Sequence, residues 1–98
     1  MEKKALISKI EAIKPALQAE GVAHLDLFGS QVRGDASSTR DLDILIDVYP
    51  NSRFSIIDLV GVEHMVGEAT GIPANAFMRR SLDDNFLRSI SRDVIKVF

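Results

Sequence analysis

The feature that most constrains this chain is a pair of apolar segments, each joined directly to a short polar motif. Residues 22–28 run into Gly29-Ser30, and residues 42–48 follow Asp41 and carry Asp43 near their start. Short runs rich in Val, Ile, Leu and Phe, bounded by turn residues, are typical of strands. The order of these pieces predicts a strand, a tight turn, a short helix over 30–34, a loop and a second strand.

The polar residues at these strand ends have the chemistry of a nucleotide and metal site. Alternate side chains of a strand share a face, so Asp41 and Asp43 are expected about 6–7 Å apart on one face. Hard cations such as Mg²⁺ prefer such oxygen ligands and usually keep waters and substrate phosphates. Gly29 permits close backbone approach to an anion, and free N–H groups beginning at Ser30 favour phosphate. The pattern predicts a triphosphate on one side of the site and its metal on the other.

The fuller pattern resembles a known family. Gly29-Ser30, Arg33-Gly34 and Asp41-x-Asp43, in this order and spacing, resemble the nucleotidyltransferase superfamily with the DNA polymerase β-like fold. Within it, the string is similar to the minimal nucleotidyltransferases (MNT), the antitoxin halves of HEPN–MNT toxin–antitoxin pairs. The resemblance covers roughly residues 5–98. It implies an α+β fold, with helices packed on a small mixed β-sheet of three to four strands.

The resemblance also implies an activity and roles for particular residues. The activity is Mg²⁺-dependent transfer of AMP from ATP to a hydroxyl on a partner protein, typically a tyrosine of a HEPN toxin. Asp41 and Asp43 are implied as the catalytic residues and metal ligands. Gly29, Ser30 and Arg33 are implied as nucleotide-binding, although Arg33 could instead fix the acidic loop that follows.

One position departs from the family pattern. Setting Gly71 against a family glycine places Asn75 where active members carry a third aspartate. An amide is neutral, takes up no proton and offers Mg²⁺ one oxygen only. The alternative function is therefore a catalytically degenerate module that binds nucleotide and partner. Asp83 or Asp84 could supply the carboxylate if this alignment is shifted, but the sequence there favours a helix start.

Composition limits the other functions that the chain could have. Ninety-eight residues predict one domain spanning 1–98, and the net charge of −2 without a Lys/Arg run argues against strong nucleic-acid binding. The absence of cysteine excludes disulfides and Cys-ligated zinc within the chain. No stretch approaches the roughly 20 apolar residues of a membrane span. The expected location is the cytoplasm.

The remaining segments predict helices and short strands around the two central strands. Residues 3–20 have helical apolar periodicity, with Pro15 causing a kink or a restart in a first turn. The other expected elements are a helix over 53–70 capped by Ser52, a strand over 73–78, a helix over 82–92 capped by Ser81, and a short strand within 94–98.

The helix over 53–70 carries more apolar residues than one buried face needs. Two interpretations stay open: a deeply buried helix, or a helix whose second apolar face meets a partner or forms a homodimer. A third hypothesis for the function is a homodimer that acts on a small molecule without a partner protein.

Several charged residues outside the motif are expected to be structural. Asp26 is assigned to a surface or hydrogen-bonded strand position, and His24 to a structural role. His64 has no obvious ligand partner and is not assigned to a metal site, and Asp47 is given a role at the strand end or in the loop. Arg40 borders the carboxylates and could contact them or substrate. Arg79 and Arg80 are interpreted as solvated charges, with contact to a phosphate or an acidic partner as the alternative.

Overall fold

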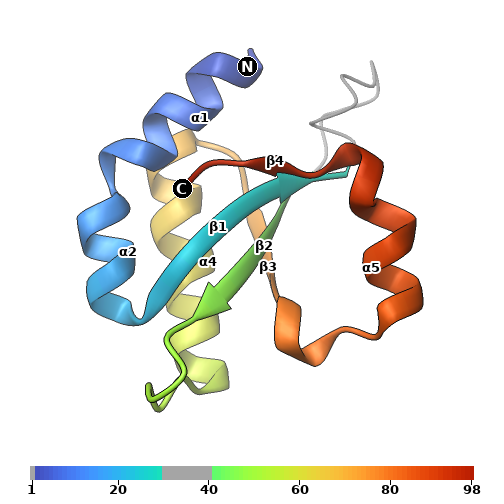
Figure 1. Ribbon diagram of the computed structural model, residues 1–98. Helices are drawn as coiled ribbons and strands as arrows, with labels where there is room; N and C mark the ends of the chain where they lie inside the picture. Colours follow the sequence, from blue (N-terminus) through green and yellow to red (C-terminus); the bar gives the residue numbers. More distant parts are fainter. Residues whose placement is uncertain (1, 30–40) are drawn as a thin grey trace.

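The fold is a four-stranded mixed sheet with helices on both faces, seen in a computed structural model that describes residues 2–29 and 41–98 (Figure 1). The strand order is β3-β2-β1-β4. β1 (Val22–Phe28) pairs antiparallel with β2 (Leu42–Val48) and with β4 (Ile95–Lys96), whereas β3 (Ala74–Met78) pairs parallel with β2. The predicted α+β fold and the two central strands are confirmed.

Three helices cover one face of the sheet and enclose the core. α1 (Lys3–Ala12), α2 (Lys14–Glu20) and α4 (Ile56–Thr70) lie together on that face, as Figure 1 shows. Alternate strand residues point between them, which removes their apolar side chains from water. The core includes Leu6, Ile10, Leu17, Leu25, Leu27, Ile44, Ile46, Val62 and Val66.

Pro15 divides the N-terminal helical segment as one of the two predicted alternatives requires. α1 ends at Ala12, and Pro15 lies in the first turn of α2. A proline costs little there because the first N–H groups of a helix have no intrahelical acceptor. The helix therefore restarts at this position.

The predicted start of α4 is wrong, because the helix begins at Ile56 and not at Arg53. Ser55, not Ser52, caps the helix: its hydroxyl accepts from the Asp58 N–H, and the Asp58 carboxylate accepts from the Ser55 N–H (2.8 Å). This reciprocal capping box satisfies two donors at once. Ser52 instead donates its hydroxyl to the Tyr49 carbonyl within the preceding turn. The predicted helix end is confirmed, because Gly71 adopts a left-handed conformation (φ 76°) as C-cap.

The C-terminal helix is also shorter than predicted. α5 spans Asp84–Ile90, and its cap is Asp83, whose carboxylate accepts from the Phe86 N–H (2.8 Å). Ser81 belongs to a separate 3₁₀ turn, Arg79–Ser81, and a second such turn, Ser91–Asp93, follows α5. Leu82 is extended between the turn and the cap, so the helix cannot begin at Ser81.

The second face of the sheet is more open and carries the polar motif. α5 lies on this side, opposite α1, α2 and α4 (Figure 1). In the part of the chain that the structure describes, no helix is both long and apolar enough to cross a bilayer.

Candidate nucleotide and metal site

Strand register brings three of the predicted site residues to one end of the open face. Phe28 lies opposite Asp43 across the β1–β2 pair, and Asp43 lies opposite Asn75 across the β2–β3 pair. Residues directly opposite in a sheet share a face. The turn at Gly29, the carboxylate of Asp43 and the amide of Asn75 therefore meet at this end of the sheet.

Asp41 joins the same group through a side-chain contact. The Asn75 Nδ2 donates to Asp41 Oδ2 at 3.0 Å, although the two residues are 34 positions apart in the sequence. Asp41 precedes β2 and is exposed, whereas Asp43 and Asn75 are partly buried. Both predicted carboxylates consequently border the residue at the predicted third-carboxylate position.

Gly29 is required by the geometry of Asp43. Its φ is +85°, a left-handed conformation that residues with a Cβ rarely adopt. A Cβ at this position would lie 2.6 Å from Asp43 Oδ2, a separation that real Cβ atoms essentially never show, so the carboxylate would have to move. The turn after β1 thus accommodates a carboxylate directly against the backbone.

The other nucleotide-binding predictions lie outside the described residues. Ser30 and Arg33, the short helix expected over 30–34 and Arg40 all belong to the segment 30–40. Their assignments stay predictions.

The donor set fits a divalent cation held partly by its substrate. Asp41 and Asp43 supply carboxylate oxygens and Asn75 an amide, which are oxygen ligands of the kind Mg²⁺ binds. Among the described residues, no group of three His, Cys, Asp or Glu side chains could enclose a metal ion. Two carboxylates suit a cation whose remaining ligands are water and phosphate.

Comparison with known proteins agrees with this geometry. Residues 10–97 match the family described as the nucleotidyltransferase domain. The chain belongs to this family. It is 29% identical, over 93% of its length and 95% of the relative's, to the protein adenylyltransferase MntA of Thermococcus cleftensis. The predicted resemblance and the predicted class of enzyme, a nucleotidyltransferase, are confirmed.

Solved structures of other proteins have the same fold. A chain described as a minimal nucleotidyltransferase superposes with a TM-score of 0.78 at 22% identity, covering 97% of this chain and 95% of that one. A complex of the tri-AMPylated Shewanella oneidensis HEPN toxin with its MNT antitoxin gives 0.69 at 14% identity, covering 100% and 72%. At these identities the likeness establishes the fold.

An ion-pair cluster that the sequence analysis missed lies on the same face of this nucleotidyltransferase. Arg79 Nε donates to Asp47 Oδ1 (3.0 Å), and Arg79 Nη2 pairs with the buried carboxylate of Asp26. Burial raises the pKa of the Asp26 carboxyl, although the charge and hydrogen bond of Arg79 act to lower it. The interpretation of Arg79 as a solvated charge is wrong, whereas Arg80 is exposed as expected. A carboxylate in the middle of a buried strand was the available signal, because it needs a partner.

Three aromatic rings cover the sheet beside the carboxylates of the nucleotidyltransferase site. Phe28 packs edge-on against Phe77 (centroids 5.5 Å apart) and Phe86 (6.3 Å). Phe86, from α5, is 38% exposed and lies at the border of this cluster. Since Phe28 lies opposite Asp43, the rings give that carboxylate an apolar neighbour on the open face.

Proposed function

We propose that this nucleotidyltransferase transfers AMP from ATP to a hydroxyl on a partner protein, with Mg²⁺, as the antitoxin half of a HEPN–MNT pair. The observation that carries the proposal is the strand register, which sets Asp43 opposite Asn75 and beside Gly29 with Asp41 in contact. The adenylyltransferase relative and the AMPylated toxin complex support the choice of AMP and of a protein acceptor. A cytoplasmic location belongs to the proposal, since ATP is made and used there.

The chemistry assigns distinct roles to the site residues. The acceptor oxygen forms a bond to the α-phosphorus of ATP, the bond to the β-phosphate oxygen breaks, and pyrophosphate leaves. Asp41 and Asp43 would hold Mg²⁺, which neutralises phosphate charge when bound. The turn at Gly29 and the predicted contacts of Ser30 and Arg33 would orient the phosphates.

Asn75 changes how the acceptor can be activated. Its amide accepts no proton, so the hydroxyl proton must go to a carboxylate or to water. Its Nδ2 donates to Asp41 Oδ2, which fixes the orientation of that carboxylate. This contact also favours a second candidate function, a degenerate module that binds nucleotide and partner without turnover.

The test is the mass of the partner protein. The chain is co-expressed with the product of the adjacent gene, and the intact mass of that product is recorded for wild type, Asp41→Ala and Asn75→Asp. We expect adducts of one or more AMP units with wild type and none with Asp41→Ala. The assay is repeated in vitro with and without Mg²⁺ and with ATP or GTP, which tests the metal and the nucleotide.

The Asn75→Asp variant separates the two candidates. Adducts with wild type identify an enzyme that tolerates the amide. Adducts with Asn75→Asp alone identify a module inactivated by this one substitution. A wild-type level of transfer by Asp41→Ala would refute the assignment of the site.

A further inference from the structure

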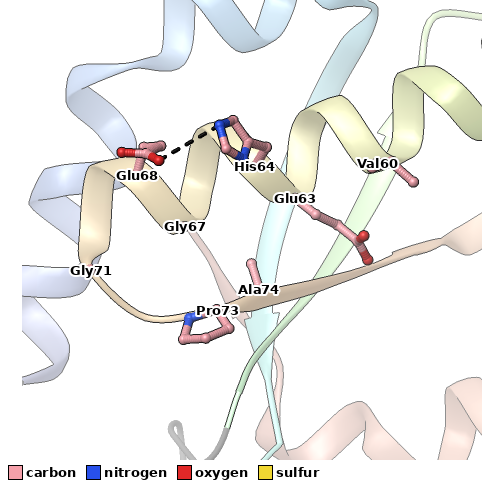
Figure 2. Close-up of a pocket in the computed structure, with 8 residues that line it drawn as sticks. All are labelled: Val60, Glu63, His64, Gly67, Glu68, Gly71, Pro73 and Ala74. Atoms are coloured by element: carbon pink, nitrogen blue, oxygen red, sulfur yellow. Dashed lines mark ion pairs between the residues drawn. The ribbon is translucent and has the colours of Figure 1, made fainter.

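We propose that the groove between α4 and the outer edge of β3 docks a partner protein, through a segment that carries apolar side chains and at least one lysine or arginine. The partner meant is the protein that receives AMP, so this inference rests on the proposed function. The groove has a volume of about 580 Å³ (Figure 2). Its lining comprises Val60, Glu63, His64, Gly67, Glu68, Gly71, Pro73 and Ala74.

The N-terminal half of α4 presents apolar side chains that the rest of the described chain leaves uncovered. Ile56 is 69% exposed, Ile57 78% and Val60 56%. Val60 also lines the groove (Figure 2). Ile56 lies four residues before Val60 on the same side of the helix, so the apolar surface continues into the groove. Clustered exposed apolar side chains are typical of interaction sites.

Within the described ranges, no neighbouring atom explains the two glycines of α4 sterically. A Cβ on Gly61 would meet no atom within 4 Å, and one on Gly67 would make only an ordinary contact of 3.6 Å with the Ile72 carbonyl. Glycine in a helix interior is nevertheless unfavourable relative to alanine. Gly67 lies in the wall of the groove, where the missing side chain lets another chain approach the helix closely.

The lower wall of the groove is a sheet edge. No strand in the described ranges pairs with the outer side of β3. The Ala76 N–H on that side donates to Glu63 Oε2 at 2.7 Å, so a side chain of α4 occupies part of the edge. A side chain that occupies a strand edge hinders the pairing of other strands with it. The surface that stays accessible is the groove between α4 and β3.

The charge of this surface indicates that a different protein, and not a second copy of this chain, occupies the groove. Residues 54–78 contain no lysine or arginine, but they contain Asp58, Glu63 and Glu68. Glu68 is exposed and lies 3.6 Å from His64. A two-fold contact between two α4 helices would place these acids against each other with no cation to offset them. A partner segment with a basic residue among apolar ones complements the surface instead.

The groove lies next to the proposed site. Pro73 and Ala74 line it, and the following residue is Asn75. The Pro73 carbonyl accepts from the N–H of Leu42, which lies between the two aspartates (2.8 Å). Of the strands, only β3 therefore lies between a protein held along this edge and the carboxylates of the site.

The test uses the two glycines as a matched pair. Gly67→Ala and Gly61→Ala each replace a helical glycine without an intrachain clash, and each is expected to raise Tm by about 4–8 °C. Only Gly67 lines the groove. The probe is the purified product of the adjacent gene, and its dissociation constant is measured by calorimetry for wild type, both alanine variants and Glu68→Lys.

We expect Gly67→Ala to weaken binding about 5- to 150-fold, as overpacking of a close contact does. Gly61→Ala should bind within twofold of wild type. Glu68→Lys should lose affinity, more strongly at low salt, because charge reversal at a rim acts through long-range attraction.

Three outcomes would overturn the proposal. The first is equal binding by wild type and Gly67→Ala. The second is a wild-type homodimer, detected by sedimentation, that Gly67→Ala dissociates while the probe does not bind. The third is a monomer that binds no probe. Failure of AMP transfer with Gly67-dependent binding intact would count against the proposed activity and leave the docking surface standing.

Discussion

Replacing Arg79 with methionine tests the ion pairs that Arg79 makes with the buried Asp26 and with Asp47. The Asp26 side chain is 10% exposed, Asp47 34% and Arg79 37%. Breaking a buried ion pair costs about 3–5 kcal/mol, and an exposed one contributes about 0–1 kcal/mol. With one carboxylate buried and the guanidinium partly in water, we expect Arg79→Met to lower the free energy of unfolding by about 2–3 kcal/mol at pH 7.

The loss should depend on pH with a defined sign. Burial already raises the pKa of Asp26 above its ordinary 3.8, and replacing Arg79 removes its charge and its hydrogen bond, which are two of the three effects that lower this pKa. The folded variant then binds a proton that the unfolded chain releases, so its stability falls as pH rises from about 4 through the raised pKa. The difference from wild type should be small near pH 4 and complete at pH 7.

The assay is urea unfolding of wild type and Arg79→Met at several pH values between 4 and 8. Asp26→Asn in the Arg79→Met background is the control, because it removes the unpaired charge and should recover part of the loss at pH 7. A stability difference that does not change with pH, or no recovery by Asp26→Asn, would refute this account of the cluster.

Three further predictions concern the site, α4 and the sheet edge. Gly29→Ala should abolish Mg²⁺-dependent ATP binding in calorimetry, because its Cβ would displace the Asp43 carboxylate; unchanged affinity would contradict the role of this turn. Ser55→Ala should cost about 1 kcal/mol in urea unfolding, whereas Ser52→Ala should leave α4 unaffected; the reverse order would restore Ser52 as cap. Glu63→Ala should speed hydrogen exchange of the Ala76 N–H, because this N–H loses its acceptor. Glu63→Gln keeps an acceptor oxygen and should leave the Ala76 N–H protected.

The sequence by itself determined the two central strands, an interruption of the N-terminal helix at Pro15 and the end of α4 at Gly71. Each depends on local chemistry: apolar runs between turn residues, a fixed proline φ, and a glycine free to adopt a left-handed conformation. The polar motif likewise lies within one short stretch, so its resemblance to the nucleotidyltransferases was visible without coordinates. Alignment of Gly71 also put Asn75 in the third strand, where the structure has it, and the register sets it opposite Asp43.

Local sequence did not determine which of two nearby residues caps α4 or α5. Ser52 and Ser55 both precede the same apolar run, as Ser81 and Asp83 both precede α5. The backbone hydrogen bonds of the folded chain selected Ser55 and Asp83.

Only the tertiary structure decided which distant side chains meet. Arg79 reaches Asp26 across 53 positions and Asp47 across 32, because β1, β2 and the end of β3 converge on one face. The exposure of Ile57 and Val60 was equally beyond the sequence, since periodicity shows that a helix is apolar but not which side its neighbours cover. Contacts between strands are set by register and layer packing, and these are properties of the whole fold.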